Sequence, residues 1–272
     1  MGLLIYGTAW KKEKTADLVV QAVLAGFRSI DTACQPKHYE EALVGEALKR
    51  LKAHGIQREE LFIQTKFTPL SGQDPQCIPY DPTATLEIQI AQSFEVSKRN
   101  LQSDYVDSLL LHSPLFPYKD LITVWKAMEK IYYSGGAKAL GISNCYDLEL
   151  LKKLYEDAII KPSVVQNRFY RESDYDIELR QWCDAKEIRY QSFWSLTANP
   201  HVLNSETVVA LAEKYDKTEA QVFYRYLCHI GITPLIGSTS VQHIAEDLAI
   251  FEFELEGDEI ARIGEVLESF VV

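Results

Sequence analysis

The chain has 272 residues, of which 47% are hydrophobic, enough to form one large domain with a sizeable core. It carries 28 lysines and arginines against 39 aspartates and glutamates, giving a formal net charge of −11. This acidity argues against binding to nucleic acid or to an anionic membrane surface. An anionic ligand must therefore be held locally, by helix N-termini or by a few basic side chains.

The cysteines and the apolar segments indicate the compartment. The five cysteines are odd in number and widely spaced, without a CxxC pair, which favours free thiols in a reducing environment. No apolar run reaches the ~18 residues that span a bilayer. The opening residues, MGLLIYGTAWKKEK, have charges after the apolar stretch, the reverse of a secretory signal. We expect a soluble cytoplasmic protein that is a monomer or a weak dimer.

Short apolar strands alternate with longer amphipathic helices along the chain. Eight strands are predicted, at residues 3–9, 27–33, 61–67, 105–112, 137–143, 163–169, 188–194 and 232–238. Helical periodicity is found around residues 16–24 and 43–51, and over 84–102, 119–133, 147–157, 174–185, 205–229 and 258–267. Thr218 and Gln221 have capping-box spacing, which predicts that 205–229 forms two helices.

Eight strand–helix units in series predict an α/β fold, a closed (β/α)8 TIM barrel in which residues 1–272 form a single domain. The structural rival is an open, doubly wound sheet. That fold would normally carry a glycine-rich turn after its first strand, but Thr8 to Lys11 contain no GxGxxG pattern. A dinucleotide, if bound, is therefore not bound in the Rossmann manner.

The predicted strands end in polar residues. In chain order, the strand ends hold Asp31, Lys66, His112, Ser143 with Asn144, Gln166 with Asn167, Phe193, and residues 237–239. Taken singly, such an aspartate is most often a helix cap, such a lysine extends to solvent, and such a histidine is a hydrogen-bonded core residue. Their shared position on one rim of the predicted barrel favours a site instead.

Three of these residues can act as one electrostatic device. A cationic Lys66 beside a phenol would favour the ionised phenol and lower its pKa, while Asp31 holds the lysine charged. His112 could orient a substrate carbonyl oxygen. Tyr39 is the available phenol in the loop after Asp31.

Over nearly its whole length, the chain resembles the aldo-keto reductase family. The segments that carry the resemblance are GTAW (7–10), GFRSIDTA (26–33), VGEAL (44–48), LFIQTKF (61–67), DYVDSLLLH (104–112), ALGISN (139–144), VVQN (164–167) and IAEDL with FEFELEGDEIARI (244–263). The resemblance implies an NAD(P)H-dependent reductase of aldehydes and ketones. It also implies a catalytic tetrad of Asp31, Tyr39, Lys66 and His112.

The resemblance also implies cofactor and substrate contacts. The residues matched to the nicotinamide half of the cofactor are Thr8, Ser143, Asn144, Gln166 and Phe193. Those matched to the adenosine half are Ser238, Ser240, His243, Glu246 and Asp247. The expected substrate pocket includes Trp10, Phe67 and Trp194, and no metal is expected.

The loop DTACQPKHYEEALVG is longer than the family usually has between its aspartate and its tyrosine. Counting forward from Asp31 puts Pro36 at the tyrosine position, whereas counting back from Val44 gives His38 or Tyr39. We choose Tyr39 as the acid, because a branch of the family has a similar QPKHY loop, and keep His38 as the runner-up.

The adenosine site also departs from the family. Members that prefer NADPH usually have a lysine and an arginine where this chain has Gly237 and His243. Serine hydroxyls and helix N–H groups remain to hold a phosphate. We expect NADPH, with NADH as a possible substitute. The chain also lacks the family's N-terminal strand pair and its long C-terminal segment, which predicts a more open pocket.

Other chemistries have little support, because the chain lacks HExxH, zinc-type Cys/His spacing, GxSxG and a P-loop. The main alternative is a catalytically weak, nicotinamide-binding regulatory subunit of aldo-keto reductase type. A barrel isomerase acting on sugar phosphates is a third possibility, supported only by the GST at 237–239.

Overall fold

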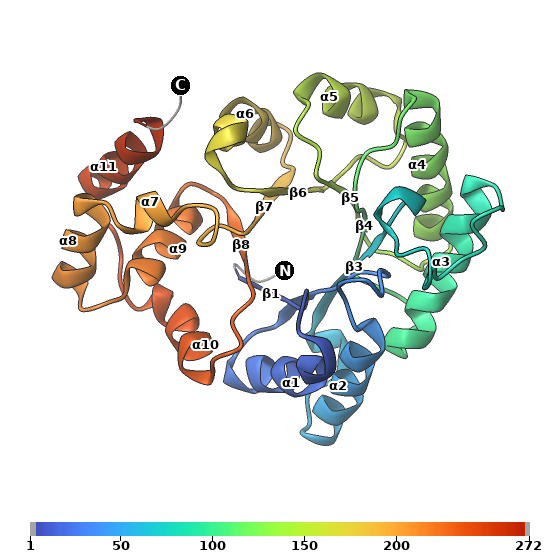
Figure 1. Cartoon of the computed structure of the whole chain (residues 1–272), viewed down its shortest axis with the longest axis horizontal. Coiled ribbons are helices and arrows are strands. Elements are labelled where there is room, and N and C mark those ends of the chain that lie inside the picture. Colours follow the sequence, from blue (N-terminus) through green and yellow to red (C-terminus); the bar gives the residue numbers. More distant parts are fainter. Residues whose placement is uncertain (1–3, 270–272) are drawn as a thin grey trace.

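The computed structural model of the chain describes residues 4–269 and has one closed parallel barrel. In Figure 1 the strands form a ring and the helices surround it. β1 pairs with both β2 and β8, so the sheet has no free edge. The strands are β1 (Ile5–Gly7), β2 (Ser29–Asp31), β3 (Phe62–Phe67), β4 (Ser108–Leu111), β5 (Leu140–Ser143), β6 (Val164–Arg168), β7 (Arg189–Phe193) and β8 (Thr233–Ile236).

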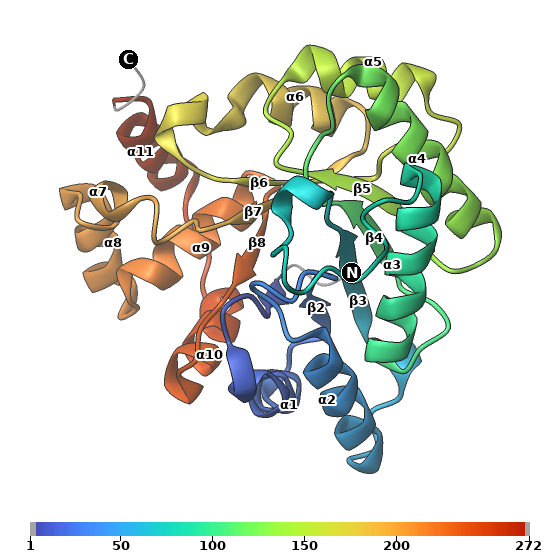
Figure 2. The ribbon, with the colours of Figure 1, turned by 45° about the vertical axis from the view of Figure 1, so that its right-hand side comes forward.

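Helices cover the outside of the barrel. Figure 2 shows α2, α3 and α4 along the flank of β3 and β4, in successive contact. The helices are α1 (Thr15–Ala25), α2 (Glu41–Ala53), α3 (Leu86–Leu101), α4 (Tyr118–Tyr133), α5 (Leu148–Asp157), α6 (Ile177–Ala185), α7 (Pro200–Leu203), α8 (Glu206–Tyr215), α9 (Glu219–His229), α10 (Val241–Leu248) and α11 (Gly257–Glu268).

The predicted (β/α)8 barrel is confirmed, and the element boundaries differ locally. Each strand is shorter than predicted: β3 and β5 lose residues only at their start, and the other strands lose residues at both ends. Leu3 of the first predicted strand lies outside the described residues. The segment 205–229 is indeed two helices, with Thr218 and Gln221 forming the capping box. The helix predicted from 174 begins at Ile177, since residues 174–176 have positive φ angles. The short helix α7 was not predicted.

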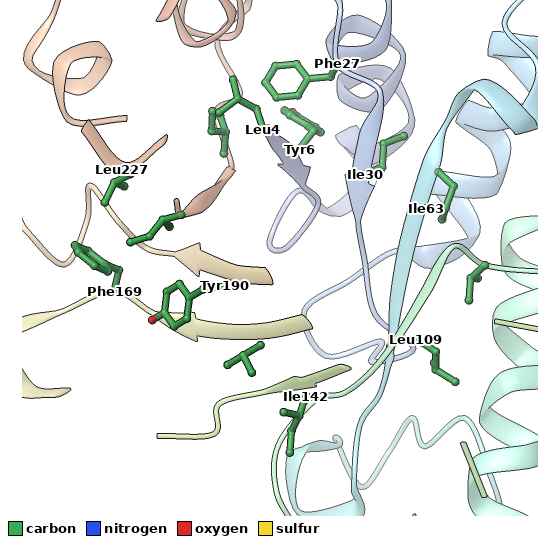
Figure 3. Packing of buried hydrophobic residues seen from close by; sticks show 14 of the residues in the cluster. Leu4, Tyr6, Phe27, Ile30, Ile63, Leu109, Ile142, Phe169, Tyr190 and Leu227 are labelled. Carbon is green, nitrogen blue, oxygen red and sulfur yellow. The ribbon is translucent and has the colours of Figure 1, made fainter. Parts of the chain in front are cut away.

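Alternate residues of each strand point outward or inward. Ile30, Ile63, Leu109 and Ile142 lie between the strands and the surrounding helices, where they form part of the hydrophobic core (Figure 3). Because a strand has a period of two, the residue after each of these faces the barrel axis. After Ile30 that residue is Asp31, so the outward apolar residues fix which polar side chains enter the barrel.

The described part of the chain also shows the state of the cysteines, the character of the helices and the clustering of potential metal ligands. All five cysteines are free thiols, and Cys34, Cys145 and Cys183 are buried. Within residues 4–269, no helix combines the length and the apolar character that crossing a membrane requires. The same residues contain no cluster of three or more His, Cys, Asp or Glu side chains suited to a metal ion.

Candidate active site

A cavity of about 920 Å³ lies at the end of the barrel where the strands end. Its wall includes Asp31 at the end of β2, His112 after β4, Gln166 on β6 and Phe193 on β7. Parallel strands that close into a barrel bring all their carboxyl ends to one mouth. These side chains therefore share one rim of the barrel, as the sequence predicts.

At the base of the cavity, Asp31 and Lys66 form a buried ion pair. Lys66 Nζ lies 2.5 Å from Asp31 Oδ2 and donates a second hydrogen bond, of 2.9 Å, to the carbonyl oxygen of Thr32. The Lys66 side chain has no exposed surface and that of Asp31 is 2% exposed. Burial lowers the pKa of Lys66, and the Asp31 carboxylate opposes this by stabilising the ammonium.

A group of barrel glutamines holds the other oxygen of Asp31. Gln64 Nε2 and Gln166 Nε2 donate to Asp31 Oδ1 over 2.7 and 3.0 Å. Both also donate to Gln191 Oε1, at 2.7 and 2.8 Å. The carboxylate is thus fixed by three donors, counting Lys66. Gln64 and Gln191 were not identified from the sequence, although they lie two residues before Lys66 and Phe193 and therefore on the same side of their strands.

Tyr39 lies against this ion pair. Lys66 Nζ is 5.3 Å from the centre of the Tyr39 ring, and the ring centres of Tyr39 and His112 are 6.0 Å apart, edge to face. His38, the alternative acid, instead stacks on Trp10 at 3.7 Å between ring centres. Tyr39 is therefore the residue of this loop that the structure brings to both Lys66 and His112.

The expected pKa of Tyr39 needs a correction. From the sequence, Lys66 was expected to lower the pKa of Tyr39, but burial and then the nearby Asp31 carboxylate raise the pKa of the phenol. The hydrogen bonds of the Lys66 ammonium go to Asp31 and Thr32, so its charge does not outweigh the desolvation of the phenol. Tyr39 accordingly carries its proton at neutral pH.

His112 is neutral and fixed. Burial, reinforced by the charge of Lys66, lowers the pKa of His112 well below 6.5. The Nδ1 atom of His112 is 2.7 Å from Thr68 Oγ1. Asn144 Nδ2 donates a hydrogen bond of 2.9 Å to the backbone carbonyl oxygen of His112. Because Thr68 occupies Nδ1, the Nε2 atom of His112 is the ring nitrogen that can contact a ligand. Thr68 was not identified from the sequence.

Most of the predicted cofactor and pocket residues line the cavity. They are Trp10, Ser143, Asn144, Gln166, Phe193, Trp194, Ser238, His243, Glu246 and Asp247. Ser143 Oγ donates 2.7 Å to the carbonyl oxygen of Gln166, which ties β5 to β6 at the rim. Asn144 has a φ of 54°, a left-handed conformation that asparagine tolerates better than most residues.

Three predicted contacts lie outside the cavity wall. Phe67 is 2% exposed and packs on Tyr80 in the core, because β3 turns this side chain outward. Thr8 is fully buried, and its hydroxyl donates 2.9 Å to the carbonyl oxygen of Asp31. Ser240 is the N-cap of α10, where its hydroxyl accepts a hydrogen bond from the backbone of His243. In this structure the three side chains act on the fold around the cavity.

A lysine not identified from the sequence lies toward the other end of the cavity. Lys11 is 5% exposed, and its Nζ donates 2.8 Å to the carbonyl oxygen of Gly237. Burial lowers the pKa of Lys11 to about 8. Nearby on α10, burial and then Glu246 raise the pKa of Asp247 to about 7. This end of the cavity is therefore less negative than its carboxylates suggest.

Comparisons with known proteins indicate the family of the chain. The Aldo/keto reductase family model matches residues 1–268. Glyoxal reductase of Bacillus subtilis (strain 168) is 34% identical over 251 residues, which are 92% of this chain and 82% of the relative. Methylglyoxal reductase DkgA of Escherichia coli (strain K12) is 29% identical over 256 residues, or 93% of this chain and 85% of the relative.

Solved structures agree with this assignment. MGS-M4, an aldo-keto reductase enzyme from a Medee basin deep-sea metagenome library, has a TM-score of 0.82 at 28% identity, covering 98% of this chain and 91% of its own. Bombyx mori aldo-keto reductase AKR2E4, in complex with NADP, has a TM-score of 0.81 at 25% identity, covering 98% and 89%. With a family model matching nearly its whole length, the chain belongs to the aldo/keto reductase family.

Proposed function

We propose that the protein uses NADPH to reduce the carbonyl group of aldehydes and ketones to an alcohol, with Tyr39 as the proton donor. Glyoxal and methylglyoxal are the first substrates to test, because relatives named as reductases of these dicarbonyls match more than 90% of the chain. The observation that carries the proposal is the buried Lys66–Asp31 pair against the Tyr39 ring, beside a neutral His112, in one cavity.

The cavity suits a nicotinamide dinucleotide. Amide and hydroxyl groups of Ser143, Asn144 and Gln166 lie near the half-buried ring of Phe193, an arrangement that fits an aromatic amide. Farther along, Lys11 and the N-terminus of α10 offer positive charge and backbone N–H groups to phosphates. When bound there, a reduced nicotinamide would supply the hydride for reduction of the carbonyl carbon.

The side chains of the chain supply the proton and the orientation. The Tyr39 hydroxyl and His112 Nε2 bind the carbonyl oxygen, and the Tyr39 proton moves to that oxygen as negative charge develops on it. The phenolate left on Tyr39 is stabilised by the Lys66 ammonium, 5.3 Å from the ring centre. Asp31, held by Gln64 and Gln166, keeps that ammonium in place.

The decisive experiment compares the wild-type protein with Tyr39→Phe and His38→Phe, using glyoxal, methylglyoxal and an aromatic aldehyde. We expect Tyr39→Phe to lower kcat by roughly 10²- to 10⁴-fold, the usual contribution of general acid catalysis. NADPH binding, followed by quenching of tryptophan fluorescence, should be unchanged. His38→Phe keeps a ring stacked on Trp10 and should retain most of the activity.

Two results would contradict the proposal. Full activity in Tyr39→Phe would remove the phenol from the proton-transfer step. NADPH binding by the wild-type protein without turnover of any carbonyl would favour a cofactor-binding regulatory role instead.

A further inference from the structure

Arg168 enters the cavity from the end of β6. It is two residues after Gln166 on the same strand, so both side chains face the barrel axis. In register it lies beside Phe193 of β7. It lines the same cavity as Tyr39 and His112. The guanidinium group is therefore part of the wall one layer above Gln166, toward the mouth.

The guanidinium group is held by aromatic rings. Its central carbon is 4.3 Å from the centre of the Trp194 ring and 5.2 Å from that of Tyr170. Trp194 has a φ of 57°, which is rare for a bulky residue and typical of strained functional positions. Stacking on both rings restricts the plane of the guanidinium group and leaves its N–H groups for a ligand.

Among residues 4–269, Arg168 forms no ion pair, a property that it shares with the half-buried Arg180, whose Nε donates to the carbonyl oxygen of Tyr175. Arg58 and Arg225, which are also at least partly buried, pair with Asp107 and Glu254. For Arg168, residues 4–269 provide no carboxylate within ion-pair distance, and its buried Nε has no hydrogen-bond partner. Arg225 Nε is likewise unmatched, but the guanidinium group of Arg225 pairs with Glu254, so Arg168 is distinguished by lining the cavity as a cation without a carboxylate partner among the described residues.

The charges around the cavity indicate what that ligand is. The Asp31 carboxylate is already neutralised by Lys66. Another cation, Lys11, lies at the Gly237 end of the cavity, where it faces the region suited to cofactor phosphates. Because the chain has a net charge of −11, an anionic substrate would need a local cation to be retained. Arg168 is suitably located for this, and a guanidinium group matches a carboxylate with two parallel hydrogen bonds.

We propose that Arg168 binds the carboxylate of the substrate, so that the site takes aldehydo- and oxo-acids in preference to their neutral counterparts. The proposal rests on the carbonyl reduction proposed above and names the substrate class of that same site. The carbonyl group is reduced at Tyr39 and His112 while the carboxylate is held at Arg168.

The test compares matched substrates. There are two pairs of substrates: glyoxylate with glyoxal, and 4-carboxybenzaldehyde with methyl 4-formylbenzoate. Within each pair, the two compounds differ in charge at one position. We expect the wild-type protein to have a higher kcat/KM for the anion of at least one pair. In Arg168→Met, the KM for that anion should rise about 10- to 100-fold, the value of a charge-assisted hydrogen bond, while that of the neutral partner changes little.

Two further variants separate charge from structure. Arg168→Lys keeps the charge without the planar fork and should restore part of the anion preference. Arg171→Met removes a nearby cation whose side chain is 50% exposed and should leave the preference unchanged. NADPH affinity, from fluorescence quenching, should be the same in all three variants.

Three outcomes would overturn the inference. Weaker NADPH binding in Arg168→Met, with KM raised equally for both members of a pair, would assign Arg168 to the cofactor phosphates. An equal loss for both members with a lower Tm would assign it to the support of Trp194. Equal reduction of charged and neutral substrates by the wild-type protein would leave the proposed reductase intact and refute the carboxylate site, whereas no reduction of any substrate would refute the reductase itself.

Discussion

The buried ion pair between Lys66 and Asp31 can be tested by removing its cation. In Lys66→Met, the Asp31 carboxylate stays in a site that is 2% exposed, with only amide donors left on one oxygen. Breaking one side of a buried pair destabilises a protein by about 3–5 kcal/mol, because the remaining charge is uncompensated. For a chain of this size, that corresponds to a Tm lower by roughly 6–20 °C.

The matched control is Lys138→Met. Lys138 also pairs with an aspartate, Asp107, at 2.9 Å, but its side chain is 59% exposed. Solvent screening limits such a pair to about 1 kcal/mol or less. Urea unfolding of both variants gives the two free energies directly. The double variant Lys66→Met with Asp31→Asn removes both charges, and we expect it to be more stable than Lys66→Met alone.

Two results would refute this reasoning. One is a loss of stability in Lys66→Met as small as that in Lys138→Met. The other is a double variant whose loss equals the sum of its two single variants, since that would mean the charges of Lys66 and Asp31 are not coupled.

Three further predictions concern pH, packing and cofactor choice. Burial lowers the pKa of His112 in the folded protein below 6.5, so as the pH falls His112 is protonated in the unfolded chain before it is protonated in the folded one. The stability of the fold with neutral His112 is therefore fully present above pH 6.5 and is lost progressively below it. His112→Gln should therefore flatten the loss of unfolding free energy between about pH 6.5 and 5.5, by up to about 1.4 kcal/mol per pH unit; an unchanged slope would contradict this. Gly141→Ala would put a Cβ 2.6 Å from the carbonyl oxygen of Val164 and should destabilise the barrel by about 1–3 kcal/mol in urea unfolding, whereas Gly257→Ala meets nothing within 4 Å and should not. His243→Arg adds a full positive charge at the α10 end of the cavity and should tighten NADPH binding about tenfold relative to NADH in fluorescence titrations; equal effects on both cofactors would show that the 2′-phosphate is not bound there.

The sequence was sufficient for the architecture because the pattern is local. Strands with polar ends, separated by helices of regular apolar periodicity, leave few ways to bury their apolar faces, and a barrel is one of them. The same pattern located Asp31, Lys66 and His112 at strand ends, and the cavity contains or adjoins all three. The boundary of α6 was missed, because residues 174–176 adopt left-handed backbone conformations that no apolar repeat signals.

The candidate site depended more on packing between distant residues. The choice between His38 and Tyr39 could not be made by counting, since the loop has extra residues; stacking of His38 on Trp10 turns Tyr39 toward Lys66. Phe67 was expected in the pocket, but the pleat of β3 directs it into the core. Such orientations depend on neighbours that are close in space and remote in the chain.

The amino-acid sequence by itself determined the barrel, the mouth at which polar residues gather and the family, since these follow from periodicity and from residue order. The tertiary structure decided the charge states of the site residues and which hydrogen-bond donors remain available to a ligand. Desolvation keeps the proton on Tyr39 and makes His112 neutral, and Arg168, which forms no ion pair with any residue that the structure describes, leaves a cation in the cavity. A pKa and a missing counterion both depend on what surrounds a group in three dimensions, which only the folded chain specifies.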